Sequence, residues 1–186
     1  HWYGSWVQVD TNTFAIAYYD YQYGAHISTF DVSADGATVT RKKDHWQHNS
    51  GTNAGKFNSF IKLSSTIYVL VYQDNSTRGV IKTFTISDDG ATITTKDTEY
   101  LLGTATNGDA KMQYNSLVKV DDNTVAVAFE GASSHGYIAA TNVNASTGEI
   151  TGAGANKYTA LLKHDGVQGL HNSLVKMGSG KYVLAY

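Results

Sequence analysis

The chain has 186 residues and a net charge of -2; 41% of its residues are hydrophobic and only 16% are charged. This length supports one domain with a sizeable core, and the near-neutral charge argues against nucleic acid or an anionic membrane as partner, since both attract a basic patch. No run of 18 apolar residues occurs, so no helix that inserts into a membrane is predicted.

The chain contains no cysteine and no proline. Without cysteine, neither disulfides nor thiolate metal sites can form. Without proline, the turns must be built from Gly, Asn, Asp, Ser and Thr. The 13 tyrosines, together with Val and Thr in short runs, favour strands over helices. We therefore predict an all-β protein.

Four short strands are predicted in the first part of the chain. Residues 5–9 (SWVQV) have one apolar side, and the turn DTNT leads into the run TFAIAY at residues 13–18. Because nearly every residue of this second run is apolar, both of its faces are expected to be buried. A third strand follows at residues 25–32, and a fourth begins at residues 37–40, after a turn that ends in Asp-Gly.

The same order of strands recurs along the rest of the chain. It restarts at Ser59, Ser116 and Ser173, at spacings of 54, 57 and 57 residues counted from Ser5. An aromatic residue stands thirteen positions after each serine: Tyr18, Tyr72, Phe129 and Tyr186. The repeat predicts units at about residues 5–58, 59–115 and 116–172, and a half unit at residues 173–186.

A repeated unit of four antiparallel strands at this length is typical of a β-propeller blade. We therefore predict a single partial β-propeller domain of about three and a half four-stranded antiparallel blades. A β-sandwich uses similar strands but not this period. Both ends of the chain fall inside the repeating pattern. We therefore expect the remainder of a longer propeller chain as the partner of this segment, and a second copy in a homodimer as the second choice.

The repeats resemble a tandem-repeat family of bacterial secreted and surface β-propellers. Three stretches carry the resemblance: NSLVKVDDNTVAVAF from Asn115, GVIKTFTISDDGATIT from Gly79 and LLKHDGVQGLHNSLVKM from Leu161. It covers nearly the whole chain, and it implies the propeller fold and an extracellular or cell-surface location. It implies no particular activity. The turn SADGATVT at residues 33–40 is close to the Asp-box of sialidase-like propellers, but its glycine falls one place early and no tryptophan follows.

The strand order predicts two unlike faces. The turns between the first and second strands and between the third and fourth strands share one face, here called the tight-turn face. The longer loops between the second and third strands share the other face, the loop face, with the spacers that join the units. Because function in repeat proteins usually lies on variable loops, we place the ligand site on the loop face.

The candidate ligand-binding residues of the loop face are aromatic, charged or histidine side chains: Tyr19, Asp20, Tyr21, His45, Trp46, His48, Asp74, Arg78, Glu130, His135 and His164. Aromatic rings beside carboxylates and amides suit sugars, because the ring stacks on the apolar side of the sugar while polar groups meet its hydroxyls. For each single residue, simple packing between blades is the competing interpretation.

Neither a metal nor another cofactor is predicted. Asp31 and Asp35 are placed as at the start of a calcium loop, but the other units lack a carboxylate at the position of Asp31. His45 and His48, with Asp44, form a second candidate. Their segment is predicted as strand end or loop, where this spacing does not bring the two rings together.

Three functions remain open at this stage. A non-enzymatic module that binds a glycan or a cell-surface ligand is our leading hypothesis. The alternative is a fragment of a propeller glycoside hydrolase or lyase, in which Asp20, Asp74 and Glu130 from adjacent units converge near the axis. The third is a structural array without a ligand. Since Asp20 and Asp74 occupy equivalent places in their units, the repeat explains them without catalysis, and we assign no catalytic residues.

Overall fold

The computed structural model of the chain describes residues 2–51, 53–102, 111–152 and 157–186. The first sheet comprises β1 (Trp2–Gln8), β2 (Thr13–Asp20), β3 (Gly24–Val32) and β4 (Val39–Asn49). The second comprises β5 (Lys56–Lys62), β6 (Ile67–Gln73), β7 (Gly79–Ile86) and β8 (Ile93–Leu102). In both sheets the strands are hydrogen-bonded in chain order, and every pair is antiparallel.

The third sheet has the same plan with a divided outer edge. It comprises β9 (Gln113–Lys119), β10 (Thr124–Glu130) and β11 (Gly136–Val143), and β11 pairs on its outer side with both β12 (Ile150–Thr151) and β13 (Ala160–Asp165). A short 3-10 turn, η1 (Ala132–Ser134), lies between β10 and β11. The hairpin of β14 (Ser173–Gly178) and β15 (Lys181–Ala185) forms the fourth sheet.

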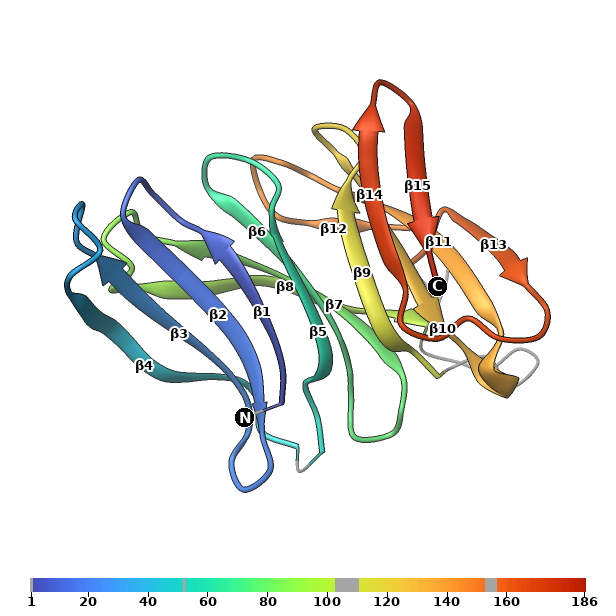
Figure 1. Cartoon of the computed structure of the whole chain (residues 1–186), viewed down its shortest axis with the longest axis horizontal. Helices are drawn as coiled ribbons and strands as arrows, with labels where there is room; N and C mark the ends of the chain where they lie inside the picture. The colour runs from blue at the N-terminus through green and yellow to red at the C-terminus, as the bar shows by residue number, and fades with distance from the viewer. Residues whose placement is uncertain (1, 52, 103–110, 153–156) are drawn as a thin grey trace.

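The four sheets stand side by side and fan around their first strands (Figure 1). β1 contacts β5, β5 contacts β9, and β9 contacts β14, so these inner strands line one side of the fan. The protein is therefore an all-β propeller with four-stranded antiparallel blades, about three and a half of them in this chain, as the sequence predicts. No helix in the described part of the chain is long and apolar enough to cross a membrane.

The core lies between the blades. β6 is buried at every residue, as predicted for a second strand with two covered faces. One of its faces packs on the first blade through Tyr68, Leu70 and Tyr72, which join Ala15, Ala17 and Ile27 in one cluster. The other face packs on the third blade through Ile67, Val69 and Val71, which join Val125, Val127 and Phe129.

The repeated serine of the inner strand joins each blade to the next. Its hydroxyl oxygen accepts a backbone N–H from the following inner strand, in the pairs Ser5 with Phe60 at 3.0 Å, Ser59 with Leu117 at 2.9 Å, and Ser116 with Leu174 at 2.8 Å. The serines recur in the sequence because each one satisfies a backbone donor of the following blade that no strand partner reaches.

Two further residues of the same motif bond to the preceding blade. The lysine three places after the serine donates to a carbonyl of the preceding turn, in the pairs Lys62 with Val9, Lys119 with Leu63, and Lys176 with Val120. The asparagine before the serine donates to the carbonyl of an aromatic residue, in the pairs Asn58 with Tyr3 and Asn115 with Phe57. The residues of the pattern Asn-Ser-x-x-Lys thus form hydrogen bonds between adjacent blades.

A row of aromatic rings runs across the inner strands at the loop face. Tyr3, Phe57, Tyr114 and His171 each precede the motif, and their ring centroids are 4.3, 4.8 and 4.4 Å apart in that order. All four have positive φ, between 50° and 60°, a conformation that is uncommon for residues with a side chain. The strand register shifts at the first three of them. Such bulges re-aim a side chain, here toward the adjacent inner strand.

Candidate functional site

The loop face holds a hollow that is lined largely by tyrosines. Its volume is about 380 Å³, and its lining residues are Tyr3, Tyr19, Tyr21, Asn53 and Lys56. We call it the tyrosine pocket. Tyr21 is 81% exposed, and Tyr3, whose ring packs on Phe57, is 37% exposed, so both rings present surface to the pocket. Tyr19 is buried, and its hydroxyl donates to Asn53 Oδ1 at 3.1 Å.

The loop between β2 and β3 holds Tyr21 in place. Asp20 Oδ1 accepts the backbone N–H of Gln22 at 2.8 Å and that of Tyr23 at 3.2 Å. The bond from Gln22 is the main cause that lowers the pKa of Asp20. The carboxylate therefore stays charged and continues to accept the two backbone N–H groups of the loop. Asp20, one of the predicted site residues, thus positions the loop. On the other side of the pocket, the Lys56 ammonium lies 5.3 Å from the centroid of the Tyr19 ring.

A second hollow of the loop face, of about 250 Å³, has Asp74, Arg78 and Tyr100 in its lining. Asp74 is buried and accepts the N–H of Arg78 Nε at 2.8 Å. This bond is also the main cause that raises the pKa of Arg78. Arg78 Nη2 donates to the Tyr100 hydroxyl at 2.8 Å, and the guanidinium lies 4.2 Å from the centroid of that ring. The predicted pair of Asp74 and Arg78 therefore lies together, and Asp74 orients the arginine.

Two predicted histidines lie at the margins of the loop face. His45 lines a third hollow, of about 410 Å³, together with Tyr23, His26 and Gln47. Its Nδ1 pairs with Asp44, its neighbour in the chain. His135 lies beside η1, with its ring centroid 6.5 Å from that of Tyr137.

The structure places Trp46, His48 and His164 between blades. Trp46 packs edge-on against Phe84 of the second blade, with ring centroids 5.5 Å apart. His48 packs on Tyr72 at 4.9 Å, and His164 packs on Tyr186 at 4.8 Å. Burial is the main cause that lowers the pKa of both histidines, and it lowers that of His48 well below the ordinary value. These contacts are the ones expected if the three residues pack between blades, which is the interpretation that competes with ligand binding.

Glu130 is a buried carboxylate at the end of β10. It is 2% exposed, and its Oε1 pairs with Lys111 Nζ at 2.5 Å. Its Oε2 has no hydrogen-bond partner among the described residues. Glu130 occupies the place of Tyr19 in the repeat, one position after the aromatic residue of the second strand. Asp20, Asp74 and Glu130 thus each have a local role in a turn or an ion pair.

Neither metal candidate of the sequence forms a ligand set. Asp31 pairs with Lys42 at 2.9 Å and accepts the Thr13 hydroxyl at 2.7 Å. His48 is buried against Tyr72, away from the exposed pair of His45 and Asp44. Within the described ranges, no three His, Asp or Glu side chains come together as a metal site requires.

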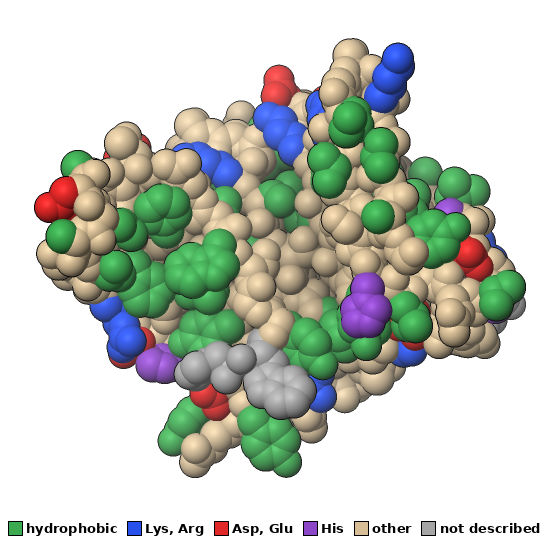
Figure 2. Space-filling view, in the orientation of Figure 1, with side chains coloured by type: hydrophobic (Ala, Val, Ile, Leu, Met, Phe, Trp, Pro, Cys, Tyr) green, Lys and Arg blue, Asp and Glu red, His purple; other side chains and the backbone are tan. Residues whose placement is uncertain are grey.

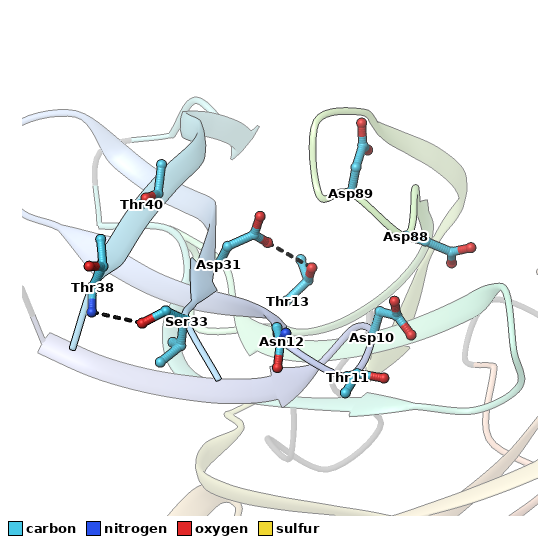
Figure 3. Close-up of a pocket in the computed structure, with 11 residues that line it drawn as sticks. Asp10, Thr11, Asn12, Thr13, Asp31, Ser33, Thr38, Thr40, Asp88 and Asp89 are labelled. Carbon is cyan, nitrogen blue, oxygen red and sulfur yellow. Dashed lines mark hydrogen bonds between the residues drawn. The ribbon is translucent and has the colours of Figure 1, made fainter. Parts of the chain in front are cut away.

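The tight-turn face also carries a hollow, which the sequence did not predict. Figure 3 shows its lining: Asp10, Thr11, Asn12, Thr13, Asp31, Ser33, Thr38, Thr40, Asp88 and Asp89. Its volume is about 540 Å³, larger than each of the three loop-face hollows described above. It forms where the turns of the first blade meet the β7–β8 turn of the second blade, a proximity that the spacing in the chain does not reveal. None of its lining residues is aromatic, so it offers no ring for a sugar to stack on.

Several lining residues of the loop-face hollows were missed at the sequence level: Tyr3, Asn49, Asn53, Lys56, Glu99 and Tyr100. Most belong to the spacers or to the fourth strands, which vary most between the units. One signal was available for Tyr3, because an aromatic residue or histidine stands two places before the serine in every unit.

The fold and this loop face define the class of the protein, which is a β-propeller. Neither a family model nor a curated protein matches the chain. Among solved structures, it is similar to the NanB sialidase from Streptococcus pneumoniae, with a TM-score of 0.62 and 12% identity over 92% of this chain and 25% of that one. It is also similar to an engineered GH43 glycoside hydrolase, with a TM-score of 0.54 and 13% identity over 97% of this chain and 35% of that one. At these identities the likeness shows the fold. The chain spans a quarter of the sialidase chain and about a third of the GH43 chain.

Proposed function

We propose that this protein is a non-enzymatic, extracellular carbohydrate-binding module, and that the glycan binds in the tyrosine pocket. The observation that carries the proposal is the pocket itself, with the exposed ring of Tyr21 and the partly exposed ring of Tyr3 beside the amide of Asn53 and the ammonium of Lys56. An aromatic ring covers the apolar side of a sugar, and the polar groups replace the water around its hydroxyls.

Two observations support a carbohydrate over another ligand. The two solved structures described above are a sialidase and a glycoside hydrolase, proteins that act on carbohydrates. The second hollow, with Arg78 held against Tyr100, adds a polar and aromatic surface to the same face. A chain of sugars that extends beyond the tyrosine pocket would meet surfaces of this kind along the loop face.

The substitution Tyr21→Ala is expected to weaken glycan binding about fivefold, because it removes the most exposed ring of the pocket and one aromatic contact is worth about 1 kcal/mol. A glycan array identifies the ligand, and isothermal titration calorimetry with that ligand measures the loss. Thr11→Ala, on the tight-turn face, is the control and leaves affinity unchanged. Equal losses in both variants, or a loss in Thr11→Ala alone, would contradict the proposed location.

One observation favours the enzyme alternative. Among the described residues, Glu130 has one buried oxygen without a hydrogen-bond partner, and a buried carboxyl group is typical of the acid of a glycoside hydrolase. Its other oxygen is held by Lys111, and hydrolysis requires a second carboxylate at about 5 to 9.5 Å. Glu130→Gln separates the two functions: a binding module shows no turnover with or without the substitution. Wild-type turnover of an aryl glycoside that disappears in Glu130→Gln would establish the hydrolase instead.

A further inference from the structure

Among the described residues that line the tyrosine pocket, Lys56 is the one charged side chain, and its charge is positive. Its ammonium lies near the Tyr19 ring and has neither a hydrogen bond nor an ion pair within the described part of the chain. Asp20, which follows Tyr19 in the chain, is not in the lining and accepts two backbone N–H groups of its own loop. The pocket therefore holds a cation that no lining carboxylate neutralises.

The amide of Asn53 adds hydrogen-bond donors to this cation. Its Oδ1 accepts the Tyr19 hydroxyl at 3.1 Å, which fixes the orientation of the amide. The Nδ2 group carries two N–H donors, and no described residue accepts them. Asn53 is exposed, so this group is open to a ligand. Apart from the tyrosine hydroxyls, which both donate and accept, the lining side chains thus offer a ligand only donors.

The repeat shows that the blades do not require these residues. Lys56 pairs with the last residue of β6, and Gln113 has the same place in the next unit, where it pairs with the last residue of β10. The residues in the place of Tyr19 are Gln73 and Glu130, and those in the place of Tyr21 are Asn75 and Ala132. The lysine and its tyrosines occur together in one unit pair, so packing common to all blades does not explain them.

We propose, on the basis of the glycan-binding function proposed above, that the tyrosine pocket selects an acidic sugar, one that carries a carboxylate or a sulfate ester. Lys56 and Asn53 bind the acidic group while Tyr21 stacks on the sugar ring. An ionised acid has only acceptors, which match the donors of the pocket, and its charge matches the ammonium. Figure 2 shows hydrophobic side chains, a class that includes tyrosine, on the β2–β3 loop at the bottom of the view.

The hollow of the tight-turn face has the opposite charge. Its lining contains Asp10, Asp31, Asp88 and Asp89 and, among the described residues, no lysine or arginine. Four carboxylates repel an acidic ligand. The charges of the two hollows therefore direct an acidic glycan to the loop face and away from the tight-turn face.

A glycan array tests the selectivity with the 186-residue chain. It presents oligosaccharides with uronic acid, sialic acid or sulfate groups beside the same glycans after methyl esterification or desulfation, which removes the charge and keeps the rings. We expect the acidic forms to bind about tenfold more tightly than their neutral partners. Equal binding of both forms, or binding of neutral glycans alone, overturns the acidic selectivity and leaves the carbohydrate-binding function standing. An array without any bound glycan overturns both.

The substitution Lys56→Gln tests the residue. Gln113 shows that glutamine fits this place in a blade. Isothermal titration calorimetry with the acidic glycan bound on the array is expected to show about a tenfold loss of affinity, while the affinity for its neutral partner stays unchanged. Because salt screens an ion pair, wild-type affinity for the acidic glycan falls as NaCl is added, and that of the variant falls less.

Lys181→Gln is the matched control for this substitution. Lys181 is an exposed lysine at the start of β15, next to a tight turn, so the variant loses the same charge far from the loop face. Its affinity for the acidic glycan is expected to equal that of the wild type. Equal losses in the two variants, or undiminished selectivity in Lys56→Gln, overturn the assignment of the acidic group to Lys56.

Discussion

The substitution Phe84→Ala is expected to lower the free energy of unfolding by about 3 to 5 kcal/mol. Phe84 is fully buried where the first and second blades meet, with its ring centroid 5.5 Å from that of Trp46 and 6.3 Å from those of Phe60 and His48. Alanine leaves a cavity there that the surrounding strands cannot close, because each is held in its sheet by pairing with its neighbouring strands. Urea denaturation followed by tryptophan fluorescence measures the loss.

The chain contains its own control for this prediction. Phe30 occupies the place of Phe84 in the first blade, but it lines a surface hollow with Trp6 and is only partly buried. Phe30→Ala is therefore expected to cost less than about 1.5 kcal/mol. Similar losses for the two variants would show that the stability does not come from the packing between blades.

Stability is expected to fall as the pH drops below 6.5 because of His48 alone. Burial lowers the pKa of His48 well below the 6.5 of an exposed histidine. The unfolded chain therefore takes up a proton as the pH falls through 6.5, before the folded chain does, and protonation favours the unfolded state. The slope is at most about 1.4 kcal/mol per pH unit, the value for one proton taken up on unfolding. Urea denaturation at a series of pH values measures it.

The matched variant for this prediction is His48→Leu. In each of the three complete blades, a register shift leaves one extra residue at the end of the outer strand; these residues are His48, Leu101 and His164. Leu101 is fully buried at this place, so leucine fits the position. His48→Leu is expected to remove the pH dependence that is due to His48 and to leave the part due to His164. An unchanged profile would mean that His48 is protonated in the folded chain.

The sequence predicted the fold well for a particular reason. Each blade is specified by residues that are local in the chain, namely alternating apolar residues, turns that end in glycine between the third and fourth strands, and a second strand that is mostly apolar. The same local pattern recurs in every unit, so a pattern that is weak in one unit can be recognised from several. The recurrence of Ser5, Ser59 and Ser116 also has a direct physical cause, since each accepts a backbone N–H of the next inner strand.

The site was predicted less completely, because its residues come from parts of the chain that are distant in sequence. Tyr19 and Tyr21 were identified from their loop, but the pocket that they line is completed by Tyr3, Asn53 and Lys56 from the first strand, the spacer and the start of β5. From the composition of the first spacer, His48 and Trp46 were predicted to contact the ligand. Their burial against Tyr72 and Phe84 depends on how two blades pack.

By itself, the sequence determined the strand order, the blade unit and the division into a tight-turn face and a loop face, because hydrogen-bonded hairpins follow from neighbouring residues. The tertiary structure alone decided which polar side chains became buried packing residues and which stayed open to a ligand. Both histidine and leucine occur at the end of an outer strand, as His48 and Leu101, and both are buried between blades. The difference depends on the facing blade, and no pattern within one unit contains that information.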